Sequence, residues 1–212
     1  MNPIQPVEEG EALKSIRIFG FAGSLRNGSY NKLLLRAARE LLPNDAQLEL
    51  FDLDGIPLYN QDTEVHGIPE SVKRFKEKIE SADALLIATP EYNHSYPGVL
   101  KNAIDWASRP YGRNSFKDKA VAVISATPGA FGGVAAQDQL KQVLLAVNTH
   151  LVVTPAVIVA SAHQKFDQQG NLTDEDTKQF LTGLLSNLTE QARLLASRSK
   201  PTVENITIRE NR

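Results

Sequence analysis

The segment Gly23 to Lys32, GSLRNGSYNK, gathers hydrogen-bond donors in the turn between an apolar run and a helical pattern. A helix that begins near Asn31 leaves backbone N–H groups without partners, and its dipole attracts an anion. Ser24 and Ser29 add hydroxyl donors, and Arg26 adds a guanidinium that suits phosphate oxygens. The spacing is neither Gly-x-Gly-x-x-Gly nor a nucleoside triphosphatase loop ending in Gly-Lys-Ser/Thr. We therefore predict a phosphate-binding turn; the alternative is a plain turn with Ser29 as N-cap and Arg26 in solvent.

Two later loops carry similar residue types in similar places. Residues 90–98 read PEYNHSYPG and residues 128–133 read PGAFGG, and each follows a continuous apolar run. Those runs, at 84–89 and 119–127, have the composition of strands that are buried on both faces of a parallel sheet. Ligands bind outside the carboxyl ends of such strands, so we expect the three loops to converge on one site.

Strand and helix patterns alternate along the chain, and these elements must position the three loops. We expect strands at 15–22, 47–53, 84–89, 119–127 and 151–159, and helices at 31–42, 69–81, 99–108, 134–149 and 173–197. The last helix has Thr173 as its expected N-cap. The alternation predicts an α/β fold in three layers, with a parallel sheet and helices on both faces. We expect a loose leader at 1–14, one domain at 15–198 and a tail at 199–212.

The composition excludes several kinds of chemistry. The 212 residues include no cysteine, which removes thiol catalysis, disulfide redox chemistry and cysteine-held metal clusters. The formal net charge of -2 gives no broad basic field for nucleic acid. No stretch has the apolar length of a membrane-spanning helix, and the first residues lack the apolar core of a signal peptide. We therefore expect a cytoplasmic protein with a small-molecule partner and no nucleic-acid, membrane or metal partner.

Segments 23–31 and 90–106 together resemble the signatures of the NAD(P)H-dependent FMN reductase family of flavodoxin-like proteins. The family patterns are Gly-Ser-x-Arg-x-x-Ser-x-Asn and Pro-Glu-Tyr-Asn-x-Ser-x-Pro-Gly-x-x-Lys-Asn-x-x-Asp-Trp, and both occur here without a gap. The family includes enzymes described as quinone, azo-dye and chromate reductases. The resemblance spans residues 15–159 and implies a flavodoxin-like sandwich with a five-stranded sheet in the order 2-1-3-4-5. It also implies non-covalent FMN as cofactor and NADPH or NADH as co-substrate.

The resemblance assigns cofactor-binding roles to residues in all three loops. The FMN phosphate would be held by Ser24, Arg26, Ser29 and Asn31. The ribityl chain and the isoalloxazine ring would be bordered by Pro90, Glu91, Tyr92, Asn93 and Ser95. The alternatives are a structural or subunit-contact role for Glu91 and a packed loop aromatic for Tyr92. The third loop would lie beside the flavin through Ser125, Thr127, Pro128 and Gly129, followed by Gly132 and Gly133, and it is less glycine-rich here than in many relatives. His94 is a weak candidate for proton donation, with a plain exposed loop residue as the alternative; no other catalytic side chain is expected, because the flavin N5 carries the hydride.

The function that these features predict is an oxidoreductase that passes two electrons from NAD(P)H through FMN to a small acceptor. The acceptor class includes quinones, azo compounds, metal oxyanions such as chromate, and free flavin. The alternatives are a non-enzymatic flavodoxin-type electron carrier, a reductase that releases FMNH2 to a partner monooxygenase, and a binding module for a phosphorylated metabolite. The family implies a homodimer or homotetramer with sites near the subunit interface. Structural or interface roles are expected for Lys101, Asn102, Asp105 and Trp106, and contacts with an NADPH 2′-phosphate for Arg109, Arg113 and Lys117.

Overall fold

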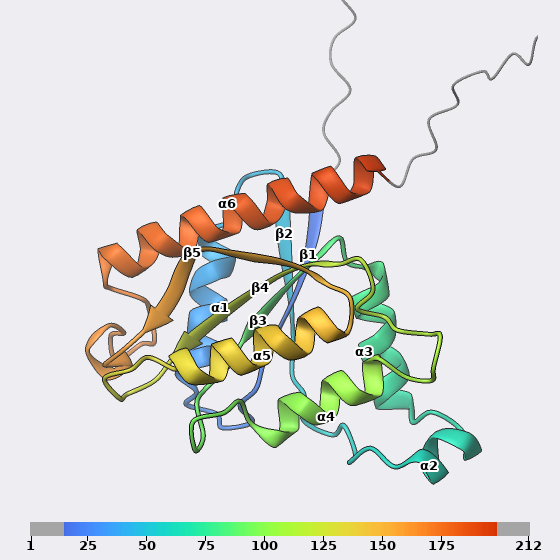
Figure 1. Ribbon diagram of the computed structural model, residues 1–212. Coiled ribbons are helices and arrows are strands. Elements are labelled where there is room, and N and C mark those ends of the chain that lie inside the picture. The colour runs from blue at the N-terminus through green and yellow to red at the C-terminus, as the bar shows by residue number, and fades with distance from the viewer. Residues whose placement is uncertain (1–14, 199–212) are drawn as a thin grey trace, which may run out of the picture.

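The computed structural model describes residues 15–198, which form a five-stranded parallel sheet between two layers of helices (Figure 1). The strands are β1 (Ile16–Ala22), β2 (Ala46–Phe51), β3 (Ala84–Ala88), β4 (Ala120–Ala126) and β5 (His150–Val159). The helices are α1 (Tyr30–Glu40), α2 (Gln61–His66), α3 (Glu70–Ser81), α4 (Gly98–Ala107), α5 (Val134–Ala146) and α6 (Glu175–Arg198), with a 3-10 turn, η1, at Ala162–Gln164. The strand order β2-β1-β3-β4-β5 confirms the predicted flavodoxin-like sandwich. The predicted leader and tail lie outside the described residues.

Alternation along the strands directs apolar side chains into two cores, one on each face of the sheet. In β1, Ile16 and Ile18 belong to the core under α1 and α6, whereas Phe19 and Phe21 belong to the core under α3, α4 and α5. Strands β3 and β4 are buried along their whole length, as their continuous apolar runs predict. The carboxyl ends of the central strands are therefore fixed from both faces.

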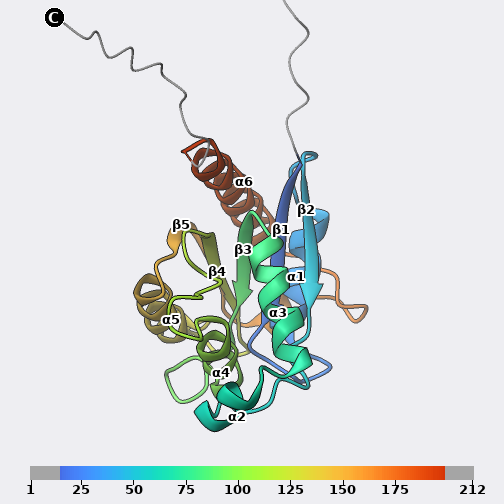
Figure 2. The same ribbon diagram turned by 90° about the vertical axis from the view of Figure 1, so that its right-hand side faces the viewer.

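The segment between β2 and α3 differs from the expectation of a loop. Residues Gln61–His66 form the short helix α2, and Asn60 is its N-cap, because its side-chain oxygen accepts a hydrogen bond from the Asp62 N–H at 2.8 Å. No residue of α2 is buried, so apolar periodicity gives no signal for this helix. In both views, α2 lies at the end of the molecule away from α6 (Figure 2).

The last helix starts at a different cap from the one expected. Asp174, not Thr173, is the N-cap of α6, because its carboxylate accepts the backbone N–H of Thr177 at 3.0 Å. Thr173 instead donates its hydroxyl to the carbonyl of Lys165, at 3.2 Å. Asp174 also pairs with the Lys165 ammonium at 2.7 Å. Hydrogen bonds from Lys165 and Thr177 lower the pKa of the Asp174 carboxyl to about 2.

Candidate functional site

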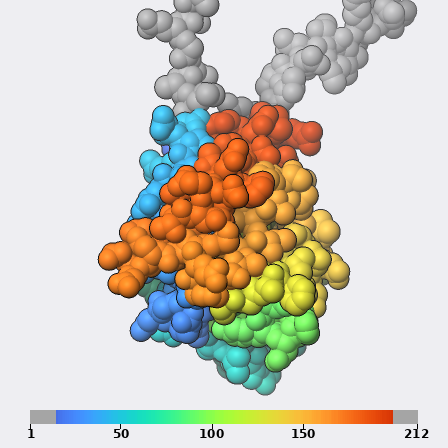
Figure 3. All heavy atoms as spheres, turned by 90° about the vertical axis from the view of Figure 1, so that its left-hand side faces the viewer, coloured from blue at the N-terminus to red at the C-terminus, as the bar shows by residue number. Residues whose placement is uncertain are grey.

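A cavity of 410 Å³ lies at the carboxyl ends of the central strands, between loop 1 (residues 23–29), loop 2 (residues 89–97) and loop 3 (residues 127–133). Its volume falls in the usual range of small-molecule pockets. Figure 3 shows segments of loops 1, 2 and 3 side by side on this face, in blue, green and yellow. The lining residues are Ser24, Arg26, Ser29, Tyr30, Asn31, Pro90, Glu91, Tyr92, Ala126, Thr127 and Pro128. Of the predicted binding residues, Asn93, Ser95, Ser125 and Gly129 lie outside this lining.

Loop 1 supplies the hydrogen-bond donors of the cavity. Ser29 is the N-cap of α1, as the simpler interpretation of this loop predicts, and its Oγ accepts the Lys32 N–H at 3.4 Å. This bond uses only a lone pair, so the Ser29 hydroxyl hydrogen stays free. Ser24 is 4% exposed, and its hydroxyl pairs with no residue of the described part of the chain. Arg26 lies over the Tyr30 ring at 5.8 Å and has no carboxylate partner within 15–198. Such unpaired donors at a helix N-terminus suit a phosphate.

Asn31 joins loop 1 to the end of β4. Its Nδ2 donates to the Ala126 carbonyl at 2.9 Å, and its Oδ1 accepts the Ala126 N–H at 3.0 Å. The side chain is buried, at 2% exposure, so these bonds form away from solvent. Asn31 therefore ties the end of loop 1 to the end of β4.

Loop 2 folds back on itself as a tight turn. The backbones of Tyr92 and Ser95 exchange two hydrogen bonds, at 2.8 and 3.0 Å. Between them, Asn93 and His94 have φ values of 52° and 61°. Two consecutive left-handed residues are typical of a type I′ turn. The His94 ring is exposed, with Nδ1 at 3.6 Å from Oε1 of Glu91.

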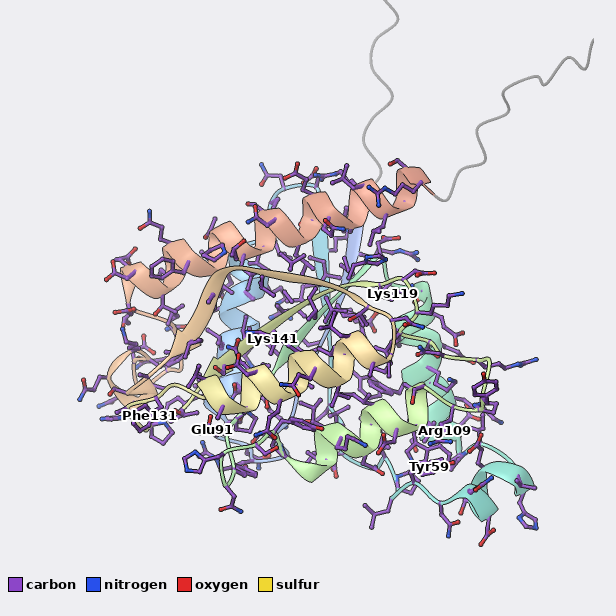
Figure 4. All side chains as sticks on the ribbon, viewed as in Figure 1. Tyr59, Glu91, Arg109, Lys119, Phe131 and Lys141 are labelled. Atoms are coloured by element: carbon purple, nitrogen blue, oxygen red, sulfur yellow. The ribbon has the colours of Figure 1, made fainter. Side chains whose placement is uncertain are left out.

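Polar side chains fasten loop 2 to helix α5. Oε2 of Glu91 accepts the backbone N–H of Ala136 at 3.1 Å, in the first turn of a helix whose N-cap glycine offers no side chain. Gln139 accepts a hydrogen bond from the Ser95 hydroxyl and donates one to the His94 carbonyl, both at 2.7 Å. Figure 4 shows Glu91 beside this end of α5. The Glu91 carboxylate therefore caps α5 from a distant part of the sequence.

Loop 3 is shaped by two glycines and a buried chain of hydrogen bonds. The Ser125 hydroxyl donates to the Gly132 carbonyl at 2.6 Å and accepts from Nε2 of Gln137 at 2.9 Å. Gly132 and Gly133 have φ values of 62° and 95°, a region that favours glycine. A Cβ at Gly132 would lie 2.5 Å from Cγ2 of Ile158 in β5. The close approach of loop 3 to β5 therefore also requires glycine at position 132. The Ser125 side chain therefore fixes the path of loop 3.

The residues expected to contact an NADPH 2′-phosphate lie elsewhere. Arg113 and Lys117 line a cavity of 790 Å³ at the amino end of β4, which shares no residue with the cavity between the loops. Arg109 packs over the Tyr59 ring at 5.2 Å, and Figure 4 shows it on the opposite side of the molecule from Glu91. Within one subunit, these three cations therefore do not line the cavity between the loops, and their contact with a 2′-phosphate stays a prediction.

Helix α4 has the structural role that the sequence predicts. Asn102 and Trp106 each donate a side-chain N–H to the carbonyl of Pro57, at 2.9 and 2.8 Å. Lys101 pairs with Asp105 at 2.7 Å along the same helix. These bonds hold the segment after β2 against α4.

The comparison with protein families shows to which family this chain belongs. The model of the NADPH-dependent FMN reductase family matches residues 16–164. The chain belongs to this family. An NAD(P)H-dependent FMN reductase of Pseudomonas aeruginosa is 47% identical over 173 residues, which cover 82% of this chain and 93% of that protein. An NAD(P)H:quinone oxidoreductase of Solanum tuberosum is 46% identical over 176 residues, which cover 80% of this chain and 89% of that protein. The solved structure of FerB, a flavoenzyme NAD(P)H:(acceptor) oxidoreductase from Paracoccus denitrificans, matches with a TM-score of 0.78 and 40% identity. The match covers 84% of this chain and 98% of the FerB chain.

The cavity fits the FMN that defines the FMN reductase family. A phosphate needs several donors and a positive charge, which the Ser24 and Ser29 hydroxyls and the Arg26 guanidinium provide. An uncharged ring needs apolar walls, and the apolar side chains of Pro90 and Pro128 line the same cavity. No group of three or more metal-ligating side chains occurs within 15–198. This FMN reductase is thus an oxidoreductase whose cofactor carries the redox chemistry.

Sequence reasoning missed the residues of α5 that organise the site. Gln137 donates to both Ser125 and the carbonyl of Val157, and Gln139 holds loop 2. Glutamine on a helix that follows a glycine loop gives no sign of a distant partner. The one available signal is the position of Gln137 on the helix face that carries Ala136 and Leu140. All three residues are buried, so a polar side chain at position 137 needs a partner.

Proposed function

We propose that this chain is an NAD(P)H-dependent FMN oxidoreductase that holds its flavin in the cavity between loops 1, 2 and 3. The observation that supports this proposal best is the set of unpaired donors in loop 1, where Ser24, Arg26 and Ser29 surround the start of α1. When bound, FMN supplies hydride acceptance from NAD(P)H and delivery of two electrons to a second substrate.

The side chains divide into those that contact the cofactor and those that position the loops. Phosphate contacts belong to Ser24, Arg26 and Ser29, with backbone N–H groups at the start of α1. The ribityl chain and ring are bordered by Pro90, Tyr92, Thr127 and Pro128, with the backbone of Asn93 and Gly129 beside them. Positioning falls to Asn31, Glu91, Ser95 and Ser125, because each of these side chains is hydrogen-bonded to other parts of the protein.

The acceptor that we propose is a small, flat, oxidised molecule, with quinones as the favoured class. The Tyr92 side chain lines the cavity and is 53% exposed, so it offers an open aromatic surface on which a planar acceptor packs. The names of the relatives support this class, since they include a quinone reductase of Pseudomonas putida. Steady-state rates with a quinone, an azo dye, chromate and free FMN as acceptors would rank them, and a rate with free FMN alone would contradict the quinone assignment.

The test of the proposed site is Arg26→Ala. Loss of a charge-assisted bond to phosphate costs about 1.5–3 kcal/mol, so we expect about 10- to 100-fold weaker FMN binding. The free energy of unfolding should fall by less than about 1 kcal/mol, because Arg26 is exposed and its guanidinium has no hydrogen-bond or charged partner within residues 15–198, apart from its packing over the Tyr30 ring. Arg74→Ala removes an equal charge from an exposed position of α3 and serves as the control.

FMN affinity by fluorescence quenching and stability by urea unfolding separate the two effects. Unchanged FMN affinity in Arg26→Ala would contradict the phosphate site. Independently, the wild-type protein should show flavin absorption bands that fade when NADPH or NADH is added without oxygen. Bands that neither nucleotide changes would contradict the enzyme assignment.

We also propose that the chain assembles as a homodimer or homotetramer in the cytoplasm, with each flavin site near a subunit interface. The exposed aromatic rings of Phe131 in loop 3 and Tyr92 in loop 2 support an apolar contact at this rim. No helix in the described range is long and apolar enough to cross a membrane. Sedimentation of a monomer at micromolar concentration would contradict the assembly.

A further inference from the structure

Asn27 and Gly28 form the outermost turn of loop 1, and both are exposed. Neither makes a hydrogen bond, ion pair or ring contact with another residue of the described chain. No hydrogen bond to the described chain therefore restrains the Asn27 amide or the Gly28 N–H. Asn27 is also the one asparagine in the whole sequence that is followed by glycine.

We propose that Asn27 is a site of spontaneous deamidation and that this modification weakens the phosphate-binding turn. The backbone nitrogen of Gly28 attacks Cγ of Asn27 and loses its proton to water. An N–Cγ bond forms, the bond from Cγ to the amide nitrogen breaks, and ammonia leaves. Water then opens the cyclic imide to aspartate or isoaspartate, so water is the only co-reactant. Because Gly28 has no Cβ, its nitrogen is open to this reaction.

The new carboxylate would lie in the turn that carries Arg26. A Cβ built on Gly28 would be 3.3 Å from Nη1 of Arg26, so the guanidinium lies against this turn. A negative charge at residue 27 would compete with phosphate for Arg26 and would repel the phosphate directly. Across a partly exposed surface, these two effects together predict about tenfold weaker FMN binding. This second step depends on the proposed function, whereas the deamidation itself does not.

Peptide mapping by mass spectrometry tests the modification on the full chain. After incubation at mildly alkaline pH without flavin, the peptide with Asn27 should convert to the acid form, and added FMN should slow the conversion. Asn114 is the internal reference, because its amide donates to the Val147 carbonyl at 2.7 Å and accepts from the Phe116 N–H at 3.0 Å. An Asn27 amide that persists as long as that of Asn114 would overturn the modification.

Gly28→Ala is the matched variant for the reaction rate. Gly28 does not have a left-handed φ, and the added Cβ would approach only the flexible end of Arg26, so the variant should fold normally. We expect it to slow the conversion of Asn27 at least tenfold, because the Cβ hinders the attacking nitrogen. Equal rates in Gly28→Ala and wild type would overturn the proposed route.

The effect on the site is measured with Asn27→Asp and with Asn27→Ser as its neutral control. We expect Asn27→Asp to bind FMN about tenfold more weakly than Asn27→Ser, with a difference that shrinks as salt rises. Equal affinities would overturn the charge effect. A wild-type protein without FMN affinity would instead overturn the proposed function, and the mass measurement would still decide the modification.

Discussion

Asn31 provides the sharpest test of how the loops of this site are held together. Pairing between β3 and β4 ends at Ala88 and Ile124, so the side of Ala126 that faces β3 has no further strand residue opposite it. The Asn31 amide takes the place of that missing peptide group, since it both donates to and accepts from Ala126. The informative change is Asn31→Ala, which removes the amide and leaves the rest of α1 intact.

The magnitude follows from the two backbone groups that lose their partner. An unsatisfied buried donor or acceptor costs about 1–3 kcal/mol, so the loss of two partners in Asn31→Ala should lower the free energy of unfolding by about 2–6 kcal/mol. For a domain of this size, the melting temperature should fall by about 5–15 °C. The residue is buried at 2% exposure, so solvent does not readily replace the lost bonds.

Urea unfolding followed by circular dichroism, without flavin, measures this loss. Asn187→Ala is the matched control, because it removes one exposed amide bond to the Thr154 carbonyl and should cost about 0.5–1.5 kcal/mol. Asn31→Asp keeps the acceptor but sets an oxygen against the Ala126 carbonyl, so it should be at least as destabilising as alanine. A cost for Asn31→Ala no larger than for Asn187→Ala would refute this reasoning and favour Asn31 as a direct flavin ligand.

Three further predictions concern the loops and the last helix. Glu91→Ala should cost about 1 kcal/mol in urea unfolding, because α5 loses its cap, and Glu91→Gln should recover part of this. Gly133→Ala should lower the free energy of unfolding by about 2–4 kcal/mol, because φ is 95° and the added Cβ would lie 2.9 Å from Cβ of Ser125. Gly112→Ala is the control and should lower it less, because φ is 84° there but the added Cβ meets no atom within 4 Å. The folded-state pKa of Asp174, about 2, lies below its ordinary value of 3.8, so its stabilisation is present above pH 3.8 and is lost as pH falls towards 2. Asp174→Asn should therefore flatten the fall in melting temperature across that range, and equal slopes in both proteins would contradict it.

The sheet could be predicted from the sequence because its central strands bury continuous apolar runs, whereas exposed elements gave weaker signals. Helix α2 has no buried residue, so nothing in the apolar pattern marks it. The sequence pattern predicts that α5 ends at residue 149, whereas the helix ends at Ala146. Asn148 adopts φ 58°, and an asparagine in the left-handed region just past the last turn is a common helix stop.

The motifs predicted which loops form the site but could not predict where each polar side chain points. Glu91 and Ser95 read as flavin neighbours, yet their side chains bond to Ala136 and Gln139 on α5, more than 40 residues later in the sequence. A short motif contains no information about such a partner, because the partner comes from a different element.

The hydrogen bonds at this rim imply that the site is ordered before a ligand arrives. Loop 1 is tied to β4 through Asn31, and loops 2 and 3 are both tied to α5, through Gln139 and Gln137. The conformational entropy of these loops is therefore lost during folding, so less conformational entropy is lost when FMN binds. It follows that substitutions at Asn31, Gln137 or Gln139 should weaken stability and flavin affinity together. Within residues 15–198, Arg26 has no hydrogen-bond or charged partner, so at Arg26 affinity should fall while stability holds.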